Sequence, residues 1–140
     1  MTLVLPPDME HWTCTYLRTT LRAMGNDVEV GNKEPSNLKT PLTRPLIVVR
    51  DDSGARGSQV TFDRSMGVSV LAGTRENDLQ ANELARLVFA VLTDEDIAVV
   101  DGSPIAAVVW DGCNGSYPVE EDHDVARRYM TVQYTVVGSW

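Results

Sequence analysis

Apolar side chains recur every three or four residues in two stretches of the 140-residue chain, and this spacing predicts two helices. The first helix is expected over residues 6–25, where Asp8 is a good N-cap and Gly25 a good stop signal. The second is expected over about residues 76–92, with acidic residues early, where the helix dipole favours them. The predicted apolar stripes are Met9, Trp12, Tyr16, Leu17, Leu21 and Met24 in the first helix, and Leu84, Leu87, Val88, Val91 and Leu92 in the second.

Other stretches have the β-branched composition or the two-residue alternation that is typical of strands. Uninterrupted apolar runs at residues 46–49 and 105–110 predict strands that are covered on both faces. The longest strand signal is the alternation over residues 128–137, while residues 28–30, 59–62 and 68–72 predict shorter strands. The order of helix, strands, helix, strands predicts an α+β fold. We expect a mixed or antiparallel β-sheet of about four to five strands with two main helices packed on one face.

A long proline-containing loop over residues 31–45 interrupts this pattern. Its length of about fourteen residues is unusual in a compact domain. Such loops are either functional arms or segments that become ordered when a partner binds. The length of the whole chain fits a single domain, residues 1–140, that includes this loop.

The net charge of −8 is concentrated in one part of the chain. Nine of the 20 acidic residues lie between Arg86 and Arg127, a stretch without Lys or Arg, and the rest of the chain is close to neutral. A negative protein gains nothing from counterion release on DNA, so nucleic-acid binding is not its expected main activity. Ten of the 12 basic residues are Arg, the cation preferred at protein contacts, although codon usage in a GC-rich genome gives the same excess.

The sequence contains no strong catalytic or targeting motif. Residues 1–7 do not resemble a signal peptide, no apolar run is long enough to span a bilayer, and the two cysteines are expected to be reduced. His11, Cys14, Cys113 and His123 could hold zinc, but their spacing is loose. Cys113 and His123 also suggest a cysteine nucleophile, but a turn after a strand explains the residues around Cys113 equally. The acidic residues 120–122 could bind Mg²⁺, but a solvated acidic loop explains them as well. We therefore expect no catalytic residue, no metal and no cofactor.

Several segments together resemble the small tail-completion proteins, or tail terminators, of long-tailed bacteriophages. The resemblance lies in residues 68–73 with the helix that follows to Leu92, and in the final segment 126–139. The N-terminal helix and the apolar strand 45–49 ahead of a charged, glycine-rich turn also fit in order. The resemblance extends over most of the chain as a pattern. The loop 31–45 and the terminal Trp140 have no counterpart in it.

The resemblance implies a structural virion protein that catalyses no reaction. Such a protein forms a six-fold ring on the head-proximal end of the tail tube, stops tube polymerisation and offers a docking surface to the neck. Its implied partners are copies of itself, the tail tube protein and a head–tail connector, with DNA only as passing cargo and no membrane. It would be assembled in the host cytoplasm and would reside at the tail–neck junction of the virion. The alternatives are a stopper or adaptor of the neck and, in a different class, a small cytoplasmic enzyme or metal-binding domain.

A ring requires two different surfaces on each subunit, because each copy meets the next through a heterologous contact. We hypothesise that Arg127 and Arg128, or Arg50 and Arg56, face acidic residues of the neighbouring subunit. The acidic stretch could instead line the channel partly and repel passing DNA. The acidic candidates for these surfaces are Asp94, Glu95, Asp96, Glu120, Glu121 and Asp122.

Overall fold

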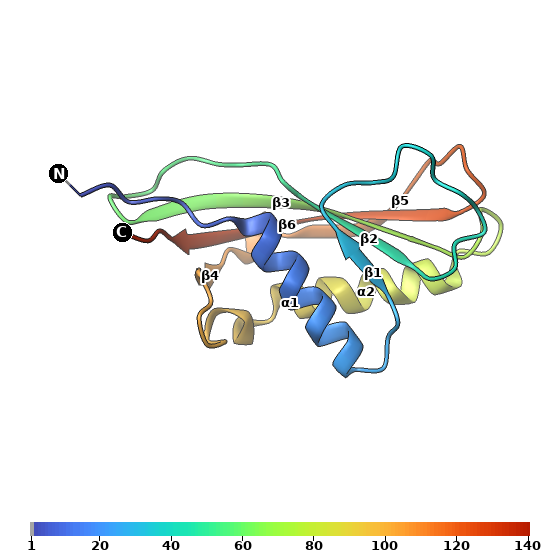
Figure 1. Cartoon of the computed structure of the whole chain (residues 1–140), viewed down its shortest axis with the longest axis horizontal. Coiled ribbons are helices and arrows are strands. Elements are labelled where there is room, and N and C mark those ends of the chain that lie inside the picture. Colours follow the sequence, from blue (N-terminus) through green and yellow to red (C-terminus); the bar gives the residue numbers. More distant parts are fainter. Residues whose placement is uncertain (1) are drawn as a thin grey trace.

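Two long antiparallel strands form the centre of the sheet. In the computed structural model, which describes residues 2–140, β3 (Thr61–Ala72) and β6 (Ala126–Val137) pair along all twelve residues of each. Both strands run through the whole length of the molecule, and the two chain termini lie together at one end of it (Figure 1). At that end, Leu5 and Ser139 form an antiparallel bridge with two backbone hydrogen bonds of 2.9 and 3.0 Å.

Shorter strands complete the sheet on either side of this central pair. On one side β2 (Leu46–Asp51) pairs antiparallel with β3, and β1 (Glu29–Gly31) adds to β2 in parallel. On the other side, β6 pairs antiparallel with both β4 (Ile105–Val108) and β5 (Asn114–Val119), at different points along its length. The sheet order is therefore β1-β2-β3-β6-β4, with β5 also beside β6.

Both main helices cover the same face of this sheet, so the predicted α+β arrangement is confirmed (Figure 1). α1 (Met9–Ala23) packs on β1 and β2, and α2 (Leu79–Thr93) packs on β3 and β6. The Asp8 side chain caps α1 by accepting a hydrogen bond from the His11 backbone N–H at 3.1 Å. Gly25, with φ of +87°, ends the helix in the left-handed conformation that glycine adopts easily. Within residues 2–140, neither helix is long and apolar enough to cross a membrane.

The main core lies between the sheet and the helices. Alternate residues of a strand point to the same face, and in the central pair most of those facing the helices are fully buried. The Tyr134 hydroxyl donates a 2.6 Å hydrogen bond to the Leu92 carbonyl of α2, which satisfies a buried polar group and ties the helix to the sheet. The fully buried residues of this set are Met66, Val68, Val70, Met130, Val132, Tyr134 and Val136.

A second, smaller core lies on the opposite face and anchors the long loop. Leu46 and Leu71 are register partners in β2 and β3, and both are buried on the face away from the helices. Leu38 of the segment between β1 and β2 packs on them, together with Val125. The predicted loop is therefore anchored to the sheet at Leu38 and Leu42, while most of its other residues are exposed.

The strand predictions need three corrections. The predicted strands 59–62 and 68–72 are one continuous strand, β3, because Asp63 and Ser65 lie on the face without helices and the pattern there is polar. The predicted buried strand 105–110 stops at Val108, and its Ala106 and Ala107 are exposed because β4 is an edge strand. The sixth strand, β5, has no counterpart among the predicted ones.

The predicted helices also differ in detail. α2 begins at Leu79 and not near residue 76, and Asp78 precedes it without a side-chain cap. In α1, Thr13 and Cys14 complete the buried stripe, whereas Met24 is exposed and Trp12 is only half-buried, stacked on Tyr16 at 5.0 Å. The stripe is rotated by about one residue from the predicted one.

Candidate interaction surfaces

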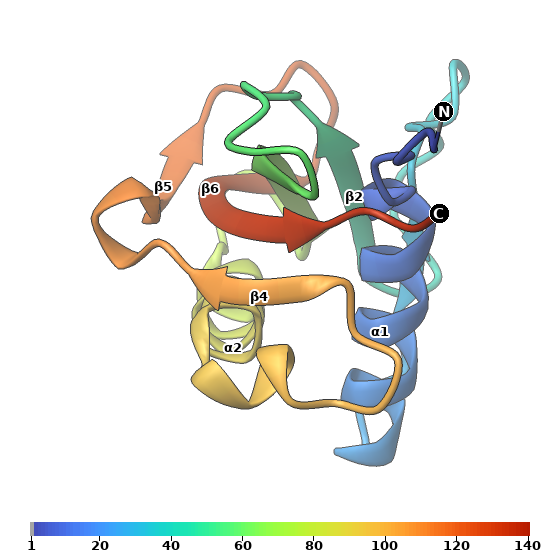
Figure 2. The same cartoon turned by 90° about the vertical axis from the view of Figure 1, so that its left-hand side faces the viewer.

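The acidic stretch of the sequence divides into two surfaces in the fold. Its first part runs from η1 (Glu95–Ala98) through the edge strand β4 and η2 (Trp110–Gly112) to β5 (Figure 2). Its second part is the loop after β5, which returns to the start of β6. We call the first surface the acidic flank, and it consists of Asp94, Glu95, Asp96, Asp101 and Asp111, all exposed.

The acidic flank carries no compensating cation within residues 2–140. Asp94 uses its carboxylate to cap η1, accepting from the Asp96 backbone N–H at 2.8 Å. No ion pair and no side-chain hydrogen bond forms to the other four carboxylates in the described part of the chain. Four negative side chains therefore remain free for an external cation.

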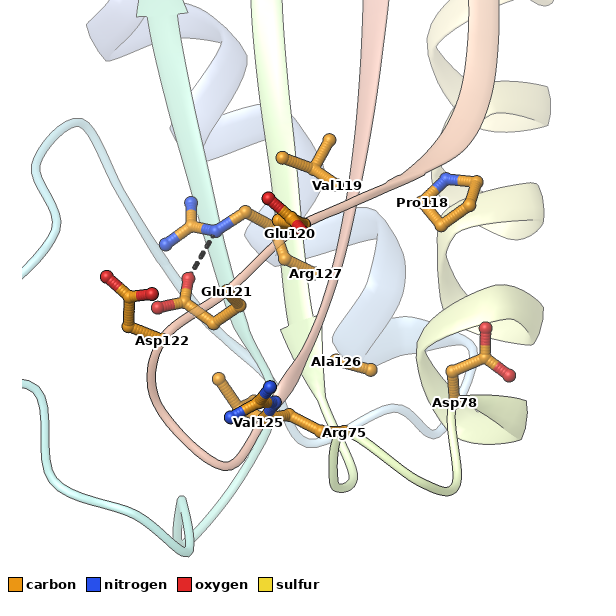
Figure 3. A pocket seen from close by; sticks show the side chains of 10 residues that line it. All are labelled: Arg75, Asp78, Pro118, Val119, Glu120, Glu121, Asp122, Val125, Ala126 and Arg127. Carbon is orange, nitrogen blue, oxygen red and sulfur yellow. Dashed lines mark hydrogen bonds and ion pairs between the residues drawn. The ribbon is translucent and has the colours of Figure 1, made fainter.

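The loop after β5 is different, because Arg127 compensates its charge (Figure 3). The Arg127 Nε donates to Glu121 at 2.6 Å, and its Nη2 donates to Glu34 of the long loop at 2.5 Å. The second Glu121 oxygen lies 2.8 Å from His123 Nδ1. These three contacts join the long loop, the β5–β6 loop and β6 into one cluster, which we call the Arg127 clamp.

The electrostatics of the clamp favour its charged form. Burial alone would raise the pKa of Glu121, but the hydrogen bonds from His123 and Arg127 outweigh it and lower that pKa to about 2. Burial alone would lower the pKa of Arg127, but the hydrogen bonds to Glu34 and Glu121 outweigh it and raise that pKa. The Glu121 side chain is 9% exposed and that of Arg127 is 17% exposed, so water screens this pair only partly.

An open cavity of about 280 Å³ lies beside the clamp, between the end of β5 and the N-terminal side of α2 (Figure 3). On its other side, Arg128 points to the helix face and its Nη2 donates to Asp78 at 2.5 Å. The backbone N–H of Arg75 donates to Asp124 at 3.1 Å. The Glu121 and Asp78 carboxylates at the cavity thus already have partners in the same chain.

The remaining two arginine candidates lie along β2 and its continuation. Arg50 donates to Asp52 at 2.6 Å and to the Tyr129 hydroxyl at 2.9 Å, on the face without helices. Gly67 lies directly beneath this cluster, where a Cβ would overlap the Tyr129 hydroxyl. Arg56 bonds only to backbone carbonyls, those of Ser58 and Gln59, and lies over the Phe62 ring at 5.1 Å.

The structure thus separates the four arginine candidates. Arg50, Arg127 and Arg128 each have a carboxylate partner within the chain. Arg56 has none within residues 2–140. Glu34 and Asp78 lie 93 and 50 positions in sequence from their arginine partners, so no local signal identifies these two contacts, whereas Glu121 lies only six positions from Arg127.

Trp110 is a candidate that the sequence pattern did not identify. It was expected to end a buried strand, but it lies in η2 and is 58% exposed. Its Nε1 donates to the Thr93 carbonyl at 2.9 Å, so the ring has a fixed position at the end of α2. Three other large apolar side chains, Leu3, Leu5 and Trp140, are 63–73% exposed and belong to the two termini.

The structure places the candidate residues of the zinc and cysteine-nucleophile hypotheses in different surroundings. No three His, Cys, Asp or Glu side chains of residues 2–140 form a group that could hold a metal ion. His123 pairs with Glu121 and not with Cys113. The Cys113 thiol lies 3.4 Å from the Val109 carbonyl, and burial raises its pKa, the opposite of what a nucleophile requires.

No protein-family model matches the chain, and no curated protein matches it in sequence.

Proposed function

We propose that this chain is an assembly protein of a long-tailed bacteriophage, which forms a ring on the head-proximal end of the tail tube. The ring ends polymerisation of the tube and presents a docking surface to the neck. Its role is to cap by assembly, without catalysis. The proposal starts from the resemblance of segments 68–92 and 126–139, which contain the last part of β3, nearly all of α2 and all of β6.

The observation that carries the proposal is the uneven distribution of charge and apolar side chains over the surface. The acidic flank lies at one edge of the sheet, and four of its carboxylates have no cation partner within residues 2–140. The exposed apolar termini and Arg56 lie at the end of the β3–β6 pair where Leu5 and Ser139 form their bridge. Cyclic rings are built from two such different surfaces on each subunit, and buried apolar anchors with charged rims stabilise protein interfaces.

A second feature supports a scaffold role. The Arg127 clamp and the small second core hold the long loop on the sheet, so the face without helices has a fixed shape. Pre-organised surfaces lose little conformational entropy when they associate. In a ring, the exposed Glu120 and Asp122 carboxylates beside the clamp would repel DNA if they faced the channel.

Labelling of the chain in intact particles tests this proposal. A tag on the chain, decorated with gold-labelled antibody and imaged by electron microscopy, should mark the head-proximal end of the tail. A label distributed along the tube, on the head shell or at the distal tip would refute the proposal. Tails detached from heads distinguish a terminator from a neck stopper. A terminator remains on the detached tail with its label, whereas a stopper stays on the head.

A further inference from the structure

The end of α2 forms an open groove whose chemistry selects a cation. The groove has a volume of about 420 Å³ and is lined by Thr93, Asp94, Glu95, Asp96 and Trp110, together with Ala90. We call it the Trp110 groove. A groove of this size accommodates one or more side chains of a partner.

Three features make the Trp110 groove electronegative. The C-terminus of α2 presents the negative end of the helix dipole, and its last turn contains no basic residue. Two carboxylates of the acidic flank, Glu95 and Asp96, are exposed at the rim. Acidic residues at a helix C-terminus are normally unfavourable, so an external cation would relieve this arrangement. The exposed indole face of Trp110 also attracts cations, and it does so best for a guanidinium.

The Trp110 ring is pre-organised to receive such a group. Its Nε1 hydrogen bond to Thr93 fixes the indole, although the side chain is 58% exposed. A fixed aromatic ring loses little entropy on binding, and tryptophan is among the residues that contribute most at interfaces. The groove therefore has the properties of a docking site for an arginine with apolar neighbours.

A surface with the complementary charge lies on the same chain, at the end of the β3–β6 pair where the two termini meet. Arg56 is the arginine candidate whose guanidinium has no carboxylate partner within residues 2–140. It lies over Phe62, whose ring edge is next to Gly138, which in turn contacts Leu5. Exposed Leu5 and Trp140 therefore lie at the same end as this cation, and we call this surface the basic tip.

We propose that the Trp110 groove of one copy binds the basic tip of a second copy, with the Arg56 guanidinium between the Trp110 ring and the Glu95 and Asp96 carboxylates. This contact joins two different surfaces of identical chains, so it can repeat around a ring. Charge complementarity selects the occupant, because the tip offers a cation that lacks a carboxylate and the groove offers carboxylates that lack a cation. The inference rests on the proposed ring-forming function and assigns its subunit contact.

Charge exchange between the two surfaces tests the contact. The mass of the purified chain is measured by sedimentation velocity over a concentration series, for wild type, Arg56→Glu, Glu95→Arg and the double variant with both changes. We expect each single reversal to weaken self-association at least about tenfold and the double variant to restore it. Trp110→Ala should weaken it to a similar extent.

Matched controls separate this contact from a general effect of charge. Arg86→Glu reverses an exposed arginine of α2, and Glu120→Arg reverses an exposed acid outside the groove. Both should associate like wild type, and circular dichroism should be the same for all variants. A wild-type chain that stays monomeric up to about 1 mM, a single reversal without effect, or a double variant that is not restored would each overturn the contact. If the chain still marks the head-proximal end of tails, the proposed function survives and only this contact is wrong.

Discussion

Replacement of Glu121 by glutamine should destabilise the fold measurably, because Glu121 holds the Arg127 clamp together. Its pKa falls from an ordinary value of 4.5 to about 2, a difference that corresponds to about 3 kcal/mol of stabilisation of the carboxylate. Its side chain is 9% exposed, so screening by water is limited. A glutamine still accepts one hydrogen bond from Arg127, and we therefore expect a loss of about 2 kcal/mol at neutral pH.

Urea denaturation at neutral pH measures this loss directly. A typical urea dependence of about 2 kcal/mol per molar converts it to a decrease of about 1 M in the unfolding midpoint. Glu120→Gln is the matched control, because Glu120 is exposed and has no cation partner within the described residues, and its midpoint should stay close to that of wild type. Equal midpoints for the two variants would refute the reasoning about the clamp.

The pH dependence of the stability difference between wild type and Glu121→Gln tests the role of Glu121 independently. The pKa of Glu121 is lower in the folded chain than in the unfolded chain, so its stabilisation is complete above pH 4.5 and is lost as the pH falls toward 2. The stability difference between wild type and Glu121→Gln should therefore shrink over this range. A difference that stays constant from pH 7 to pH 3 would contradict the assigned pKa.

Three further substitutions test other parts of the structure. Gly67→Ala should lower the free energy of unfolding by about 1–3 kcal/mol in denaturation experiments, because its Cβ would overlap the Tyr129 hydroxyl. A second change, Tyr129→Phe, should recover part of that loss, and no recovery would exclude this overlap as the cause. Tyr134→Phe should cost about 1–2 kcal/mol through its hydrogen bond to Leu92, and unchanged thermal stability would contradict it. Leu38→Asp should release the long loop from the second core, so limited proteolysis should cut between β1 and β2 faster than in wild type; equal cleavage rates would count against this anchor.

The sequence pattern predicted the parts of the fold whose signals are local. The Asp8 cap, the Gly25 stop and the alternation in β6 each depend on neighbours within a few positions, and the structure has all three. The continuity of β3 was missed, because Asp63 and Ser65 resemble a turn when the solvated face of the sheet is unknown. Local pattern indicates the period of an element and not which of its faces meets solvent.

The candidate surfaces depended on long-range geometry and were predicted only in outline. The four arginines were named together, yet only the fold separates Arg56 from the three that have carboxylate partners. Trp110 follows an apolar run and resembled a core residue, because exposure at a sheet edge is a property of tertiary structure. The acidic stretch was evident from the sequence, but its division between the acidic flank and the Arg127 clamp was not.

Tail length in particles made without this chain tests the central proposal most directly. Electron microscopy of such particles measures the distribution of tail lengths and the fraction of tails joined to heads. The proposal predicts overlong tails of variable length without heads, and a return to uniform length when the wild-type chain is supplied. Tails of normal, uniform length beside empty, leaking heads would contradict termination and would place the chain in the neck as a stopper.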